Sequence, residues 1–426
     1  MDYFPLAPKG SRGGFRFAGM PLLGFGDRSG GIDQSTVWQR VWFGLRALGC
    51  RVILNRLMKF NWSIAAAAVF LIAMTRTTVA NGLDFEVYWR TVHAVFSGDP
   101  IYSLQREGNM VFKYPPWILP LFLPFAVLPL YWAKAAWGVF QGVALILVVR
   151  RLHVAKVSQR VLLGVFLSFA GIWTNHAYLG QVALPMLAAA VCLDKVFLEG
   201  SRGTRFQLLI WSLSTKILSL FPVLGFQWKR RDLRPILITA VIFAGLTLPF
   251  IIATGNGPFE ILHSWTHSAT SGATPIAGVH VTVAGREAQG FPSFIFRVFH
   301  LNENNIPLVL LVCSFCAGVL ATFWRWAQSR LEPNESWAGW LALTATVQPL
   351  AGYYSFCLAF PLAVYAMDRA VRSRRVLQIS LPVLGITMIC ALTRKTLGDE
   401  AGRFVETISI KSWGVLFCAG TLLFKS

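Results

Sequence analysis

The chain has 426 residues, of which 55% are hydrophobic and only 14% are charged. A soluble domain carries about 25% charged residues, so this composition excludes an ordinary soluble protein and indicates a polytopic helical membrane protein. The net charge of +20 does not favour nucleic-acid binding, because the basic residues cluster in short segments between apolar runs, as they do in membrane proteins.

The N-terminal region precedes the first apolar run. Residues 1–35 are rich in Gly, Arg and Ser and lack helical periodicity, so they are predicted to be a disordered, basic cytoplasmic tail. Residues 36–59 fit two interpretations equally well. They form either an amphipathic basic helix on the inner membrane surface or an ordinary cytoplasmic flank of the first span. Both place the basic side in the cytoplasm, and residues 60–426 are then the transmembrane domain.

The distribution of basic residues predicts the topology. The first span, near 60–79, leaves the cytoplasm and places the segment 81–113 outside. Further cytoplasmic points are marked by five basic clusters, at 150–160, 201–205, 229–234, 325–330 and 368–375. The external segments that these anchors imply are 174–181, 254–290 and 348–354.

Two regions leave the number of spans open, and about 10–13 are expected. Residues 206–226 must cross an even number of times, which a single apolar run can do only as a re-entrant hairpin. Residues 116–149 must cross an odd number of times although their length suits two helices. Either Pro120, Pro124 and Pro129 break the first helix into a partial span, or 150–160 is external and the positive-inside rule fails there.

The stretch after the first span is dense in ionisable groups. Its apolar and aromatic residues fall on one face of a helix that we expect to lie flat on the outer interface, and Asp84 stands at its start. The spacing leaves two roles for Asp84 equally open, a helix N-cap and a functional carboxylate. Glu86 falls on the polar face of the same helix.

Possible metal sites carry little weight. Cys313 and Cys316 form a C-x-x-C in an apolar run without further ligands, so they are predicted to be small core residues. His263 and His267 are four residues apart, which permits metal binding, but a surface helix at the membrane interface is the favoured interpretation. No metal and no cofactor are expected.

Four segments occur in an order that is similar to glycosyltransferase family 87. They read "GLDFEVYWRTVHAVFSGDPIYS", "FKYPPWILPLFLPFAVLPLYWAKAAW", "LGQVALPMLAAAVCLD" and "STKILSLFPVLGFQWKRR". This family contains mannosyl- and arabinofuranosyltransferases of the GT-C superfamily that use polyprenyl-phosphate donors. The resemblance covers residues 60–235 well and the second half more loosely. Gly352 and Tyr353 stand near the positions where the family often carries Trp and His.

The resemblance implies an all-α, GT-C type fold and a mechanism. Asp84, next to the first span, would be the general base of a single inverting displacement. Three residues are candidates for binding the donor phosphate, namely Lys216, Arg297 and His176. The candidates for substrate binding are Glu86, Tyr88, Tyr114, Gln181 and Tyr353. Three of these residues have a structural alternative: Lys216 can snorkel at a span end, and His176 and Gln181 can satisfy helix ends.

The predicted function is therefore transfer of a sugar, with mannose as the first choice. The donor would be a polyprenyl-phosphate-linked sugar and the acceptor a lipid or glycan. The predicted location is the cytoplasmic membrane, with the active site facing the periplasm or cell exterior. The alternative is a flippase or transporter of lipid-linked saccharides without catalysis, which would pair charges at mid-membrane.

Overall fold

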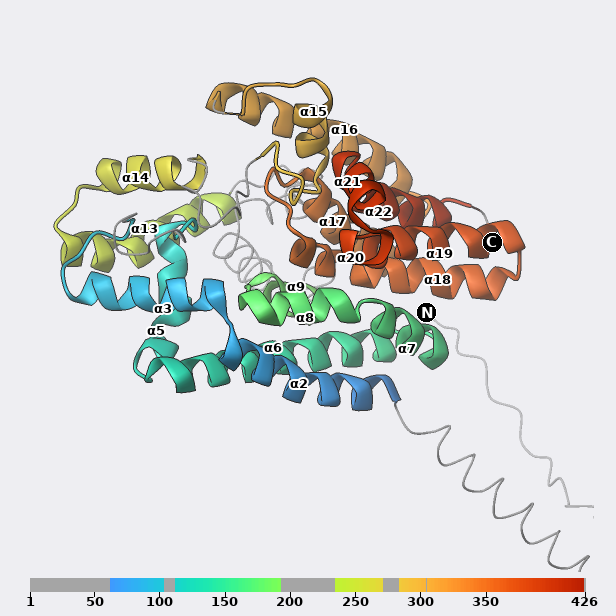
Figure 1. Cartoon of the computed structure of the whole chain (residues 1–426), viewed down its shortest axis with the longest axis horizontal. Coiled ribbons are helices and arrows are strands. Elements are labelled where there is room, and N and C mark those ends of the chain that lie inside the picture. Colours follow the sequence, from blue (N-terminus) through green and yellow to red (C-terminus); the bar gives the residue numbers. More distant parts are fainter. Residues whose placement is uncertain (1–61, 103–111, 193–233, 271–282, 304, 425–426) are drawn as a thin grey trace, which may run out of the picture. The chain divides into compact units, whose positions relative to one another are not determined.

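The computed structural model describes residues 62–102, 112–192, 234–270, 283–303 and 305–424 (Figure 1). These residues form helices, turns and loops and no strand, so the all-α prediction is confirmed. The predicted tail 1–35, the basic segment 36–59 and the hairpin 206–226 with Lys216 lie outside the described residues.

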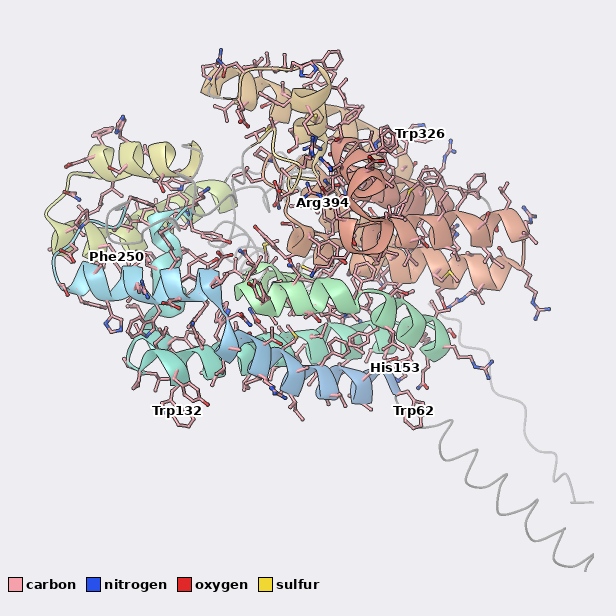
Figure 2. All side chains as sticks on the ribbon, in the orientation of Figure 1. Trp62, Trp132, His153, Phe250, Trp326 and Arg394 are labelled. Atoms are coloured by element: carbon pink, nitrogen blue, oxygen red, sulfur yellow. The ribbon has the colours of Figure 1, made fainter. Side chains whose placement is uncertain are left out.

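The fold begins with a tightly packed pair of helices, α2 (Trp62–Ala80) and α6 (Leu130–Val154). Gly138 and Gly142 of α6 face α2, and a Cβ atom on either glycine would lie 2.6 Å from Thr75 or Leu71. Such a small-xxx-small spacing lets two backbones approach closely in a membrane. The helices run antiparallel, and Figure 2 accordingly shows Trp62 near His153, at the start of α2 and the end of α6.

The segment 116–149 forms one short helical element and one long helix. A 3₁₀ turn (η1, Pro116–Ile118) leads into α5 (Leu119–Ala126), which ends before Pro129, the N-cap of α6. Proline removes a backbone donor and fixes φ, which accounts for the short apolar helix before the long one. A short helix followed by a long one fits the first of the two interpretations of this segment, and the side of the membrane on which 150–160 lies stays a prediction.

Three helices of the described chain are long and apolar enough to cross a membrane: α2, α6 and most of α16 (Ile306–Gln328). The helices α7 (Gln159–Ser168) and α8 (Ala170–Leu179) meet at 51° and give a fourth span if they count as one. The expected 10–13 spans stay a prediction. The remaining helices are α9 (Ala183–Cys192), α13 (Arg234–Thr254), α14 (Pro258–Thr270), α15 (Phe291–Val298), α17 (Pro333–Val347), η4 (Tyr353–Ala359), α18 (Phe360–Ser373), α19 (Val376–Cys390), α20 (Arg394–Leu397), α21 (Asp399–Thr407) and α22 (Ile410–Thr421).

The stretch after the first span forms α3 (Leu83–Phe96), as predicted, but its apolar face does not lie open to lipid. Phe85 is fully buried, and its ring stacks on Trp137 of α6 with centroids 5.3 Å apart. Phe122 of α5 lies 4.5 Å from the ring of Tyr88. The proline-rich run thus turns back under α3 and covers its aromatic face with protein.

Basic clusters that are far apart in the sequence share one end of the bundle. Asp368 of α18 accepts a hydrogen bond from the backbone N–H of Ser158 at 2.9 Å and pairs with Arg372 at 2.6 Å. Arg369 pairs with Glu335, near the start of α17, at 3.0 Å. The segments 150–160 and 368–375 and the start of α17, which follows the cluster 325–330, therefore meet near the C-terminal end of α6, as expected if they face the same side of a membrane.

Candidate active site

A cluster of polar residues forms at the other end of α6, around the start of α3. Gly82 is the N-cap of α3 and has φ of +48°, a conformation that favours glycine. Because Gly82 is the N-cap, the N-cap interpretation of Asp84 is wrong. Asp84 is the second residue of the helix, and its Oδ2 atom accepts a hydrogen bond from the side-chain amide of Gln181.

Gln181 is held on both sides. Its side-chain oxygen accepts a hydrogen bond from the hydroxyl of Tyr114 at 2.9 Å, and its backbone oxygen accepts one from Gln141 at 3.0 Å. With the oxygen occupied by Tyr114, the amide nitrogen is directed toward Asp84. Gln181 is only 4% exposed and Gln141 is fully buried. Because both partners are fixed, Gln181 can orient the Asp84 carboxylate without moving.

Three phenols surround this carboxylate. Tyr88 lies edge-to-face with Tyr114 at 5.3 Å between ring centroids, and Tyr354 comes from the 348–359 segment. Burial raises the pKa of all three, and the negative charge of Asp84 contributes to each shift. At neutral pH these phenols are therefore neutral and able to donate hydrogen bonds.

Glu86, two residues beyond Asp84, faces different partners. Its carboxylate pairs with the ammonium of Lys134 at 2.7 Å and with Arg90 one turn along α3. Lys134 also donates to the backbone oxygen of Asn81 at 2.9 Å. Burial alone would raise the pKa of Glu86, but Lys134 and Arg90 together hold it below its usual value. These contacts tie the start of α3 to α6.

Two other predicted residues make contacts that support the fold. His176 is fully buried, and its Nε2 atom accepts a hydrogen bond from the backbone N–H of Leu184 at 2.8 Å, which joins α8 to α9. Tyr353 donates to the backbone oxygen of Cys390 at 3.0 Å, and the ammonium of Lys411 lies 4.2 Å from its ring. The structure therefore brings Asp84, Tyr88, Tyr114 and Gln181 together and gives His176 and Tyr353 other contacts.

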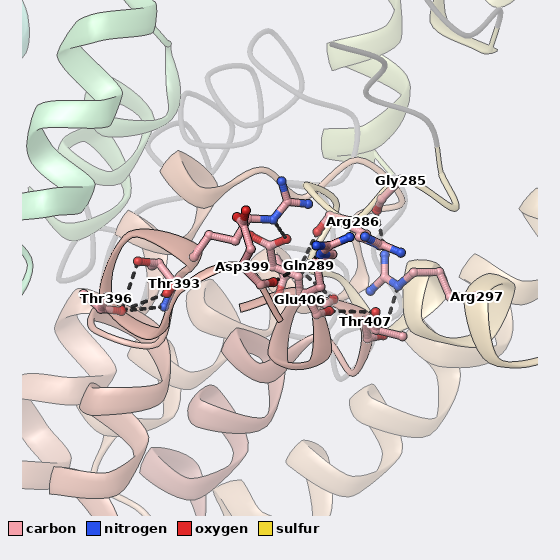
Figure 3. A network of polar contacts seen from close by, with 11 residues as sticks. Gly285, Arg286, Gln289, Arg297, Thr393, Thr396, Asp399, Glu406 and Thr407 are labelled. Carbon is pink, nitrogen blue, oxygen red and sulfur yellow. Dashed lines mark hydrogen bonds and ion pairs between the residues drawn. The ribbon is translucent and has the colours of Figure 1, made fainter. Parts of the chain in front are cut away.

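Arg297 belongs to a separate network (Figure 3). Its guanidinium donates to the backbone oxygens of Gly285, Ala288 and Thr407 at 2.7–3.0 Å and to the hydroxyl of Ser409 at 2.5 Å. Burial lowers its pKa to about 10, which leaves it charged at neutral pH. These four bonds join the loop before α15 to the α21–α22 connection.

Several cluster residues were not among the predicted ones. Gln141 and Thr78 are polar residues within apolar helices, and Thr78 donates to the backbone oxygen of Ala177 at 3.0 Å. The sequence could have indicated them by their position inside apolar spans, because polar side chains there are unfavourable unless they are paired. Lys113, which directly precedes the predicted Tyr114, was also not among the predicted residues.

The described side chains offer no evident metal site. Within the described ranges, no three His, Cys, Asp or Glu side chains are grouped closely enough to hold a metal ion. His263 lies on α14 and is exposed, and the side chain of His267 lies outside the described residues.

The family model of glycosyltransferase family 87 matches residues 112–351, more than half of the chain. The chain belongs to glycosyltransferase family 87. The protein is accordingly a glycosyltransferase with membrane-spanning helices. The match contains Tyr114, Gln141 and Gln181, while Asp84 and Tyr354 lie outside it. Comparison with curated proteins and with solved structures gave no match.

Proposed function

We propose that this family 87 glycosyltransferase transfers a sugar, with mannose as the first choice, from a polyprenyl-phosphate carrier to a hydroxyl group of a lipid or glycan acceptor. The observation that carries the proposal is the Asp84 carboxylate, oriented by Gln181 at the end of α2 and surrounded by neutral phenols. A single oriented carboxylate beside hydrogen-bond donors suits a general base next to a sugar.

The proposed reaction is one inverting displacement. Asp84 takes the proton of the acceptor hydroxyl as its oxygen forms a bond to the anomeric carbon of the sugar. The bond from that carbon to the phosphate oxygen breaks, and its electron pair leaves with the polyprenyl phosphate. The hydroxyls of Tyr88 and Tyr354 provide donors for oxygen atoms of the substrates, while that of Tyr114 donates to Gln181.

A retaining reaction has less support. It requires a second carboxylate about 5 Å from the first to act as a nucleophile. Glu86 is the carboxylate next to Asp84 in sequence, and it is engaged by Lys134 and Arg90. A carboxylate held between two cations is a weak nucleophile, which favours the inverting mechanism.

The proposed location is the cytoplasmic membrane, with the Asp84 cluster at its outer face. The basic segments 150–160 and 368–375 meet at one end of α6, and Asp84 lies near the other, beside Lys134 and Gln141. Because basic segments favour the cytoplasmic side, the opposite end faces the periplasm or the cell exterior. A lipid-borne donor then reaches the site from the outer leaflet.

The test is transfer by membranes that contain the protein. Radiolabelled polyprenyl-phosphate-mannose and a lipid extract are supplied to membranes with wild-type protein, with the Asp84→Asn variant or without the protein. Incorporation that requires the wild-type chain supports the proposal. Movement of the labelled lipid between leaflets without incorporation of mannose would instead indicate a flippase.

A further inference from the structure

The short segment from Phe112 to Tyr114 lies against the Asp84 cluster and is fixed by three hydrogen bonds. Ser268 of α14 donates to the backbone oxygen of Phe112 at 2.8 Å, and Trp265 of the same helix donates to that of Lys113 at 3.2 Å. The hydroxyl of Tyr114 donates to Gln181, the partner of Asp84. The backbone of Lys113 is therefore placed from both sides.

The ammonium group of Lys113 has no such partner. It is partly buried, and it forms no hydrogen bond or ion pair with another residue of the described chain. Burial lowers its pKa, and the charge of Asp84 opposes that shift, so the two groups are close enough to interact electrostatically. A partly buried cation that forms no direct ion pair within the described chain is stabilised further when an anion binds beside it.

Two other cations of the described chain are already engaged. Lys134 is bound to Glu86 and to the backbone oxygen of Asn81. Arg297 uses four hydrogen bonds within its own network. Lys113 therefore differs from both in having an ammonium that is available to a ligand.

We propose that Lys113 binds the phosphate of the lipid carrier and stabilises it as it leaves, an inference that rests on the proposed function. In an inverting displacement the base and the leaving group lie on opposite faces of the sugar. The cation that binds the leaving phosphate must therefore lie near the carboxylate without pairing with it. Lys113 meets this condition with respect to Asp84. The phosphate gains negative charge when the sugar leaves, so its interaction with the ammonium strengthens in the transition state.

Binding of a short carrier tests this directly. The purified full-length protein is titrated with farnesyl monophosphate, farnesol and inorganic phosphate, and tryptophan fluorescence reports binding. The variants are Lys113→Met, Lys113→Arg and, as a control, Lys395→Met, which removes an exposed lysine on α20. Loss of one charge-assisted contact should weaken farnesyl phosphate binding about 10- to 100-fold in Lys113→Met.

The expected pattern distinguishes binding of the phosphate group from binding of the farnesyl tail. Lys113→Arg should restore most of the affinity, Lys395→Met should match wild type, and farnesol binding should be the same in all four proteins. Equal farnesyl phosphate affinity in wild type and Lys113→Met would overturn the inference. Inorganic phosphate that binds as tightly as farnesyl phosphate would overturn the assignment to the lipid carrier.

The transfer assay separates this inference from the proposed function. If Lys113→Met transferred mannose as fast as wild type, the role of Lys113 would be refuted and the proposed function would stand. Lys113-dependent binding of farnesyl phosphate without transfer of any sugar from a polyprenyl phosphate would refute the proposed function and leave the phosphate site in place. If wild type bound no farnesyl phosphate, the phosphate site would be refuted.

Discussion

Exchanging Asp84 for asparagine removes one charge and little else. The asparagine side chain has nearly the same shape, and its oxygen can still accept the hydrogen bond that Asp84 accepts from Gln181. Gln181 keeps its orientation because Tyr114 and Gln141 hold it independently of Asp84. The variant should therefore fold normally and bind its substrates, but it cannot take a proton from the acceptor.

The size of the effect follows from the role of the group. General-base catalysis contributes about 10²–10⁴-fold, so turnover should fall by that factor, equivalent to about 2.7–5.4 kcal/mol in the activation free energy. A hydrogen bond to a carboxylate contributes about 1 kcal/mol more than one to a neutral amide. The cost in stability should be no larger than that difference, so the loss of turnover greatly exceeds the loss of stability.

Glu86→Gln is the matched control on the same helix. It weakens the pair with Lys134 and should cost about 1–3 kcal/mol of stability with a smaller effect on turnover. The pKa of Glu86 in the folded protein lies below its unfolded value. The pair's contribution to stability is therefore complete above the unfolded pKa and is lost as the pH falls through the folded one. The variant should lack this acid-dependent loss.

The assay measures initial rates of mannose transfer and apparent melting temperatures for wild type, Asp84→Asn and Glu86→Gln in the same membranes or nanodiscs. The expected result is that Asp84→Asn loses rate and keeps its melting temperature, whereas Glu86→Gln loses melting temperature and keeps most of its rate. Transfer by Asp84→Asn within a few-fold of wild type, with transfer by folded Glu86→Gln abolished, would refute the assignment of the base.

Further predictions concern the rest of the chain. Gln181→Leu should lower kcat about 10-fold or more with little change in KM and should shift the pH–rate profile, because it frees the base rather than removing a substrate contact; an effect on KM alone would contradict this. A cysteine at Ser97 should react with an impermeant thiol reagent added to intact cells and one at Arg375 should not, and the reverse would invert the proposed topology. Transfer should survive EDTA, since a monophosphate donor does not require a divalent ion; loss that manganese restores would oppose the mechanism. Gly339→Ala should destabilise the protein strongly, because its Cβ would lie 1.7 Å from an indole atom of α16, whereas Gly164→Ala meets open space; equal melting temperatures would contradict the packing.

The sequence by itself determined the class of the protein, its family and the neighbourhood of the site. Hydropathy and the positions of basic residues depend only on local composition, so they predicted a helical membrane protein and a carboxylate-rich segment after the first span. Helical periodicity predicted α3, and the resemblance to family 87 together with the predicted outer-face position led to Asp84, Tyr88, Tyr114 and Gln181, which the structure brings together. The sequence could not choose between a capping and a functional role for Asp84.

Only the tertiary structure decided what each ionisable group contacts. Asp84 and Glu86 are two residues apart, yet one meets Gln181, 97 residues along the chain, and the other meets Lys134, 48 residues along. The two residues point in different directions from the helix, so each reaches a different part of the fold. No local pattern encodes such distant contacts, and among the described residues the ammonium of Lys113 forms no ion pair although it lies close to the carboxylate.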